Sequence, residues 1–247
     1  MNTEPLTGEA PTVLGSYAHG WDILRGHIWR LVLLLFLFGV LQAPANVGNL
    51  HESADLLGTL YQVLVVGPLS FGLSWVFLIA VRGHKPEVSD LFAPFQRSYF
   101  PAVAASILLP IVVLIAALPM IGVFAIAVLG DEPSPVFLVG ALALSGLPIF
   151  AAVRLSFVPY LLVDETLGPI EVLGESWEKT QPVQMQILGV ELLSLPVLLL
   201  GLLLFLVGVF PAMILAGLAL STIYDDVCPE VTGEADENPA EPGPAVG

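Results

Sequence analysis

The chain has 247 residues, of which 56% are hydrophobic and only 12% are charged, and its mean hydropathy is +0.89. Soluble domains carry about a quarter of their residues as charges, so this composition excludes an ordinary soluble protein and indicates a membrane protein. The formal net charge is -15. Nucleic-acid binding needs lysines and arginines that displace counterions from phosphates, so we expect no nucleic-acid partner. The single cysteine, Cys228, excludes an intramolecular disulfide.

The two ends of the chain are polar. We expect residues 1–14 to form a disordered tail, and residues 225–247, which hold acids but no basic residue, to form an acidic disordered tail. Residues 15–224 are expected to form a single helical membrane domain. The first residues lack the positive region of a signal peptide, so we expect the first apolar run to be retained as an anchor.

Six apolar runs are long enough to cross a bilayer, which takes about 20 helical residues. The runs cover residues 28–43, 58–81, 100–122, 136–162, 183–201 and 205–224. The division between the last two is the least marked, because only glycines and Pro211 interrupt the apolar sequence there. The sequence therefore predicts an all-α, polytopic membrane protein with about six transmembrane helices, arranged as three hairpins.

All basic residues except Arg154 fall on one side of the predicted topology. They lie before or at the start of the first run, between the second and third, and between the fourth and fifth: Arg25, Arg30, Arg82, Lys85, Arg97 and Lys179. The opposite loops contain no lysine or arginine. Because short cytoplasmic loops are enriched in these residues, we expect both termini in the cytoplasm and the protein in the bacterial cytoplasmic (inner) membrane.

A short amphipathic helix is predicted before each hairpin. In residues 170–179, Ile170 and Trp177 are seven positions apart and share one helical face, while three glutamates fall on another face. Similar spacing occurs before the other hairpins, and the candidate interfacial face consists of Trp21, Phe92, Phe95, Ile170 and Trp177.

These segments also indicate a unit repeated three times. Aligning Arg25, Arg97 and Lys179 places an apolar residue at the same position in each segment. The alternative, left open here, is that any multi-pass protein places aromatic and basic residues at this interface.

Arg154 lies inside an apolar run, "AAVRLSFVPYLLVDE". A charge at the centre of a span costs about 2.5 to 3.5 kcal/mol on insertion scales, and such residues usually face the bundle and pair. Glu191 in the next run reaches nearly the same depth, so we predict an ion pair between Arg154 and Glu191, direct or bridged by Gln184 or water. With Ser194, these residues form a candidate polar cluster. A substrate or ion site, or an Arg154 side chain that extends to lipid phosphates, remains an alternative.

One segment and the apolar hairpin after it resemble a known family. "RLSFVPYLLVDETLGPIEVLGESWEKTQ" and the later "LALSTIYDDV" resemble the YciC-like bacterial membrane proteins and the membrane domain of some glycerophosphoryl diester phosphodiesterases, and "SDLFAPFQRSYF" resembles their middle segment. The matching positions are Arg154, Asp164, Gly168, Glu171, Ser176, Trp177 and Tyr224. The resemblance implies a helical membrane domain of mostly unknown activity, and implies that any phosphodiesterase catalysis resides in a separate soluble barrel.

No catalytic motif is present in the sequence. The four histidines lack metalloprotease spacing, and neither a nucleophile elbow nor a P-loop occurs. We therefore expect no catalytic activity, no cofactor and no metal. The predicted function is a scaffold or helper that engages membrane lipids or a membrane protein partner at the cytoplasmic face. The alternative is a small transporter or exporter component that uses proline-broken helices and the Arg154 and Glu191 pair.

Overall fold

The computed structural model describes residues 12–47, 55–129, 135–165, 167–203 and 208–229, and all regular elements in these ranges are helices. The two predicted tails lie largely outside the described residues. Six helical stretches are long and apolar enough to cross a membrane: Val13–Ala45, Leu56–Val81, Tyr99–Val128, Val136–Asp164, Gln184–Leu203 and Val209–Val227. The predicted all-helical, six-span architecture is confirmed, and the last two spans divide between Leu203 and Val209.

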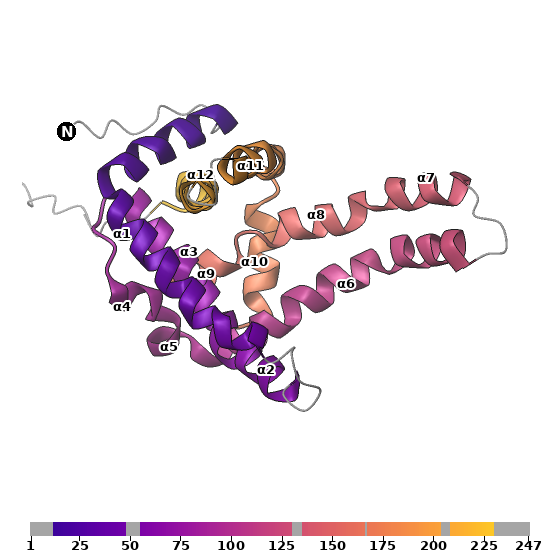
Figure 1. The fold of residues 1–247 in the computed structure, drawn as a ribbon, viewed down its shortest axis with the longest axis horizontal. Coiled ribbons are helices and arrows are strands. Elements are labelled where there is room, and N and C mark those ends of the chain that lie inside the picture. Colours follow the sequence, from indigo (N-terminus) through magenta and orange to yellow (C-terminus); the bar gives the residue numbers. More distant parts are fainter. Residues whose placement is uncertain (1–11, 48–54, 130–134, 166, 204–207, 230–247) are drawn as a thin grey trace, which may run out of the picture.

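The first span begins earlier than predicted, because the short helix expected before it is continuous with it. Helix α1 (Val13–Val47) bends at His27, whose backbone has the non-helical angles φ -128° and ψ 19°. The part before the bend packs against α11 (Gln184–Leu203) and α12 (Val209–Val227), where the Tyr17 hydroxyl donates to the Val190 carbonyl at 3.0 Å. In Figure 1 this part of α1 lies beside α11 and α12, which are seen end-on.

The second span contains a π-helical turn. It consists of α2 (Asp55–Tyr61), η2 (Gln62–Val66) and α3 (Gly67–Val81). Two short helices follow, α4 (Val88–Leu91) and α5 (Ala93–Arg97), at the position where a short helix is predicted. Gly72 of α3 is so close to the backbone carbonyl of Leu91 that no side chain fits between them. A bare glycine backbone therefore lets α4 pack directly on α3.

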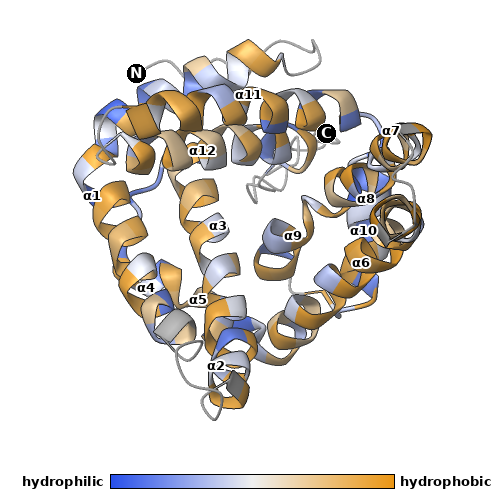
Figure 2. Cartoon of the chain, turned by 45° about the vertical axis from the view of Figure 1, so that its right-hand side comes forward, coloured by the Kyte–Doolittle hydropathy of each residue, from blue (hydrophilic) through white to orange (hydrophobic). Residues whose placement is uncertain are grey.

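The third and fourth spans form a hairpin that extends away from the other helices (Figure 1). It is built from α6 (Tyr99–Leu129), α7 (Pro135–Leu144) and α8 (Gly146–Leu155). The fourth span then bends, and its last part, α9 (Val158–Asp164), leaves the hairpin and lies in the middle of the molecule (Figure 2). Apolar residues of α9 on all sides are buried, so this short helix is a central element of the core.

The hairpins do not run parallel to one another. In Figure 1, α6, α7 and α8 are seen from the side, whereas α11 and α12 are seen end-on. The α6 surface is largely exposed and apolar, with side chains such as Leu114, Ile115 and Leu118 more than half exposed. Large exposed apolar surfaces are rare on monomeric soluble proteins, and here they are the surfaces that lipid can cover. The helix α10 (Glu171–Lys179) contacts both α8 and α9 where the hairpins meet.

Candidate functional site

Arg154 lies at the last turn of α8, immediately before the chain bends into α9. The residue is only 8% exposed. Its Nη1 donates to the carbonyl of Trp177 at 3.0 Å, and the centre of the guanidinium lies 5.2 Å from the ring centroids of both Phe150 and Trp177. Two aromatic faces and a carbonyl oxygen therefore compensate a charge that would be costly in apolar surroundings.

Helix α10 also binds the backbone of Arg154. The Ser176 hydroxyl donates to the Arg154 carbonyl at 2.8 Å. The Thr180 hydroxyl lies 3.3 Å from the same oxygen, but the Ser176 carbonyl is its closer acceptor, at 2.7 Å. The last carbonyls of a helix lack partners within the helix, so the Ser176 hydroxyl satisfies a group that the end of α8 leaves free. The buried face of α10 consists of Val172, Ser176 and the C-cap Thr180, which are spaced four residues apart. Arg154 thus connects α8 to α10.

The predicted direct ion pair between Arg154 and Glu191 is wrong. Among the described residues, no acidic group lies within 4.0 Å of the Arg154 guanidinium. Ser194 donates to the carbonyl of Glu191 on its own helix at 2.6 Å. The prediction treated the two spans as straight neighbours, but Arg154 lies at the end of α8, where α10 packs and its Trp177 binds the guanidinium.

Gln184, another predicted member of the cluster, faces α8. It lines a pocket of about 420 Å³ between α8 and α11 together with Phe150 and Val153. Its Oε1 and the Nε of Arg154 are both buried without a hydrogen-bond partner.

The low exposure of Arg154 argues against the alternative in which its side chain reaches lipid phosphates.

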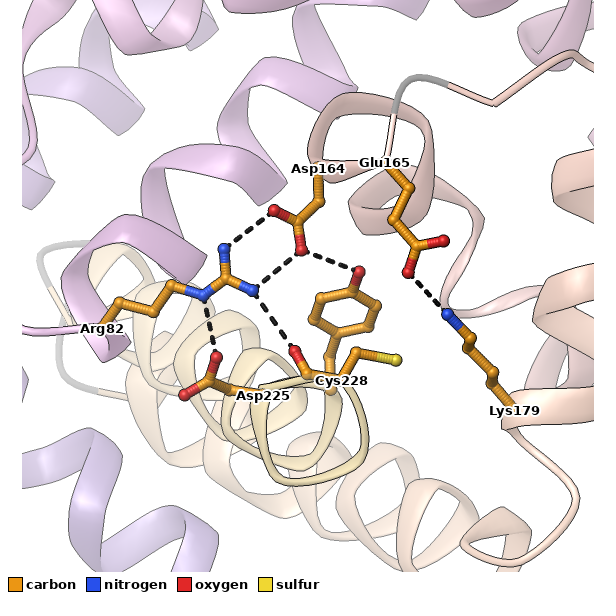
Figure 3. Close-up of polar contacts among 7 residues, drawn as sticks. Arg82, Asp164, Glu165, Lys179, Asp225 and Cys228 are labelled. Carbon is orange, nitrogen blue, oxygen red and sulfur yellow. Dashed lines mark hydrogen bonds and ion pairs between the residues drawn. The ribbon is translucent and has the colours of Figure 1, made fainter. Parts of the chain in front are cut away.

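A second polar site joins the ends of three spans, and we call it the Arg82 network (Figure 3). Arg82 caps the end of α3, and its side chain is 6% exposed. Its Nη1 and Nη2 donate to the two carboxylate oxygens of Asp164 at 2.9 and 2.8 Å, in the bidentate geometry that suits a guanidinium. Its Nε donates to Asp225 at 2.8 Å, and Nη2 also reaches the Cys228 carbonyl at 3.3 Å.

Tyr224 completes the Arg82 network. Its hydroxyl donates to Asp164 Oδ2 at 3.1 Å, and its ring stacks on Tyr160 at 5.0 Å between centroids. Burial by itself lowers the pKa of Arg82, but the hydrogen bonds and charges of Asp164 and Asp225 outweigh it and raise the pKa overall. Arg82 is therefore a permanent cation that holds α3, α9 and α12 together.

Lys179 forms a more exposed group beside this network. Its Nζ is 2.5 Å from Glu165 Oε1 and 3.4 Å from Glu175 Oε1, with side chains between a quarter and two fifths exposed. Burial raises the pKa of the Cys228 thiol, and the charge of Lys179 partly offsets this effect.

The predicted interfacial face is split in the structure. Ile170 is 79% exposed and Trp177 is 42% exposed, and Trp21 is similarly open. Phe92 and Phe95 are instead half-buried and pack against the core cluster of α1 and α3. Their rings are 6.0 Å apart and continue into a stack of Phe95 on Tyr99.

The proposed repeat is not reflected in equivalent contacts. Arg25 lies over the ring of Trp21 and Arg97 lies over the ring of Trp75, whereas Lys179 forms ion pairs. The short helices share a position before each hairpin, but their basic residues have different roles.

Sequence reasoning missed the Arg82 network. Arg82 was assigned only as a loop charge, and Asp225 was assigned to the acidic tail. Two of the family positions quoted above, Asp164 and Tyr224, do contact each other, and so do Arg154, Ser176 and Trp177. The resemblance therefore pointed to residues of both sites, but it did not identify Arg82 as their partner.

Over the described part of the chain, no three His, Cys, Asp or Glu side chains are grouped closely enough to hold a metal ion. Comparison of the chain with family models, curated proteins and solved structures finds no match.

Proposed function

We propose that this chain is a membrane scaffold or helper without catalytic activity, whose short helices engage lipid or a membrane protein partner. The observation that carries the proposal is that its most buried cations serve as connections between helices. Arg82 is bound by Asp164 and Asp225, and Arg154 is bound by a carbonyl and two aromatic rings. Both side chains have their polar partners within the protein, as expected of residues that hold a rigid set of helices together.

The surface that these helices leave open supports the second half of the proposal. Ile170, which caps the start of α10, and Trp177 within it leave large apolar groups exposed, while a different face of the helix is anchored by Ser176. An anchored helix with exposed apolar side chains is suited to contact a membrane surface or another protein. We place this face on the cytoplasmic side of a bacterial inner membrane, on the basis of the loop charges.

The alternative function, a transporter component, is less well supported. It relied on an Arg154 and Glu191 pair, and Arg154 is instead committed to α10. Transport pathways usually bring several polar groups together at one depth. Two buried polar atoms without a hydrogen-bond partner, Gln184 Oε1 and Arg154 Nε, keep this alternative testable.

Affinity capture of the full chain from mild detergent, with the bound proteins and lipids identified, tests the proposal. We expect a stoichiometric partner or a retained lipid, and we expect Ile170→Ser to release it. Glu178→Gln, an exposed change on the same helix, serves as the control and should retain it. Stabilisation by a small solute, with no partner or lipid retained, would instead favour the transporter.

A further inference from the structure

The bend of α1 forms a pocket that concentrates positive charge. Its volume is about 450 Å³, and its lining includes Arg25, His27, Trp29, Arg30 and, from the loop after α3, Lys85. Arg25 and Arg30 are five residues apart, which on a straight α-helix would put them about 140° apart around the axis. The bend at His27 lets both line the same pocket.

These cations are free of acidic partners. The chain has seven basic residues, and three of them are bound by acids or a carbonyl: Arg82, Arg154 and Lys179. Arg97, outside the pocket, and Arg25, inside it, each lie over one aromatic ring. Within the described ranges the three pocket cations, Arg25, Arg30 and Lys85, form no ion pair, and all three are exposed. The described lining contains no acidic residue, and the nearby Asp90 carboxylate accepts the backbone N–H of Glu87 at 2.7 Å. In a chain of net charge -15, three unpaired cations around one pocket indicate an anionic ligand.

An apolar groove adjoins this pocket. It has a volume of about 310 Å³ and is lined by Trp29, Val32, Leu33, Phe36 and, from α12, Phe210. Trp29 borders both the pocket and the groove and is 85% exposed. Tryptophan is enriched at the level of the lipid headgroups, so the basic pocket lies where a headgroup would be and the groove lies where acyl chains would be.

We propose that this combined site binds one anionic phospholipid, with its phosphate among Arg25, Arg30 and Lys85 and an acyl chain along the groove. A lipid of this class carries both features that the site presents, a negative headgroup and an apolar chain joined to it. The unpartnered, buried Nδ1 of His27 is a further polar group at this level. Basic pockets beside transmembrane helices are a known means of recognising acidic headgroups. The inference deepens the proposed function, on which it rests, by naming the lipid.

The test uses the full chain in detergent, titrated with phosphatidylglycerol that carries bromine on its acyl chains. Bromine quenches nearby tryptophan, and the Trp29→Phe variant identifies the part of the quenching that comes from the groove. We expect phosphatidylglycerol to quench Trp29 at lower concentration than brominated phosphatidylcholine. Each charge near a headgroup contributes about 1 kcal/mol, so Arg30→Gln or Lys85→Gln should raise the half-saturating concentration about 5-fold, and the double variant about 25-fold.

Arg97→Gln removes the same charge from an exposed residue outside the pocket and should leave the titration unchanged. Equal quenching by phosphatidylcholine, or an unchanged titration in the double variant, would overturn the site. Complete displacement by millimolar glycerol phosphate would overturn the lipid assignment in favour of a soluble phosphate ligand. These outcomes are separate from the proposed function, because the capture experiment with Ile170→Ser depends on α10 and not on this pocket.

Discussion

Arg154 illustrates how a charge can be accommodated in an apolar helix without an acidic partner. Its guanidinium faces two rings and one carbonyl, and its own carbonyl accepts the hydroxyl of Ser176 in α10. A planar guanidinium can stack and donate at the same time, which an ammonium cannot do.

Arg154→Lys should therefore lower stability although it keeps the charge. Loss of the stacked geometry is expected to cost about 2 kcal/mol, the value for desolvated contacts between cations and aromatic rings. The measurement is reversible unfolding of the detergent-solubilised protein as dodecyl sulfate is added. Arg97→Lys, at an exposed residue over a single ring, is the control and should have a smaller effect. Equal stability of the wild type and Arg154→Lys would contradict this account.

The thiol of Cys228 should react as a half-buried group. Because burial raises its pKa, the midpoint of its alkylation rate against pH should lie above the value of about 8.5 for a free thiol. Lys179→Gln removes a nearby charge that favours the thiolate, so it should move the midpoint further upward. Since Cys228 is the only cysteine, alkylation followed by mass measurement reports on it alone. A midpoint that falls in Lys179→Gln would show that the lysine does not stabilise the thiolate.

At the scale of the helices, contacts between short elements determine how the spans are arranged. The central helix α9 is seven residues long and contacts α3 and α10. Isolated helices of this length are unstable in water, so α9 depends on its packing within the core. The Arg82 network fixes one end of α9, and Arg154 lies just before the other.

Arg82→Gln should have a large effect, because it leaves Asp164 without its bidentate partner and frees the ends of α3, α9 and α12. Breaking a buried pair from one side costs about 3 to 5 kcal/mol. Lys179→Gln, which removes the more exposed pair with Glu165, should cost less than about 1 kcal/mol. The same unfolding titration compares the two variants. Similar losses in both would argue that the Arg82 network is no stronger than a surface ion pair.

Gly72→Ala should separate α4 from α3. A methyl group at this position would overlap the backbone carbonyl of Leu91, which cannot move aside as a flexible side chain could. We expect a loss of about 1 to 3 kcal/mol, as for other overpacked sites. The matched control is Gly39→Ala in α1, where no atom lies within 4 Å and the change should be neutral or stabilising. If both variants behave alike, the close approach of α3 and α4 does not contribute to stability.

For the whole molecule, the hairpins diverge instead of forming one parallel bundle (Figure 1). The hairpin of α11 and α12 is seen end-on in the view in which the hairpin of α6, α7 and α8 is seen from the side, so the two point in different directions. Transmembrane helices tilt by up to about 40° from the membrane normal. In this arrangement the hairpins therefore cannot all be perpendicular to one flat membrane plane. The α6 and α7 hairpin buries little of its surface, and its neighbours in a membrane would be lipid or a partner.

The loop charges predict that both termini face the cytoplasm. A phosphatase reporter that is active only outside the cytoplasm, fused after Gly247, should therefore be inactive, whereas the same reporter in the loop at residues 130–134 should be active. The basic residues that determine this orientation include Arg30 and Lys85, so replacing both with glutamine should weaken the bias. An active reporter after Gly247 in the unaltered chain would reverse the topology.

The sequence by itself determined the features that depend on neighbouring residues. Six apolar runs were visible because crossing a membrane requires about 20 consecutive apolar residues, and the short helix at residues 171–179 was visible from its periodicity. Arg154 was correctly singled out, since an unpaired charge in such a run needs compensation wherever its partner lies.

Only the tertiary structure decided which groups compensate which charges. Arg82 meets Asp225 across 143 positions, and no local pattern encodes such a contact. Glu191 was the wrong partner for Arg154, because equal depth on adjacent spans says nothing of bends such as the one between α8 and α9. Pairing depends on the directions and close packing of helices distant in sequence, which arise when the whole chain is assembled.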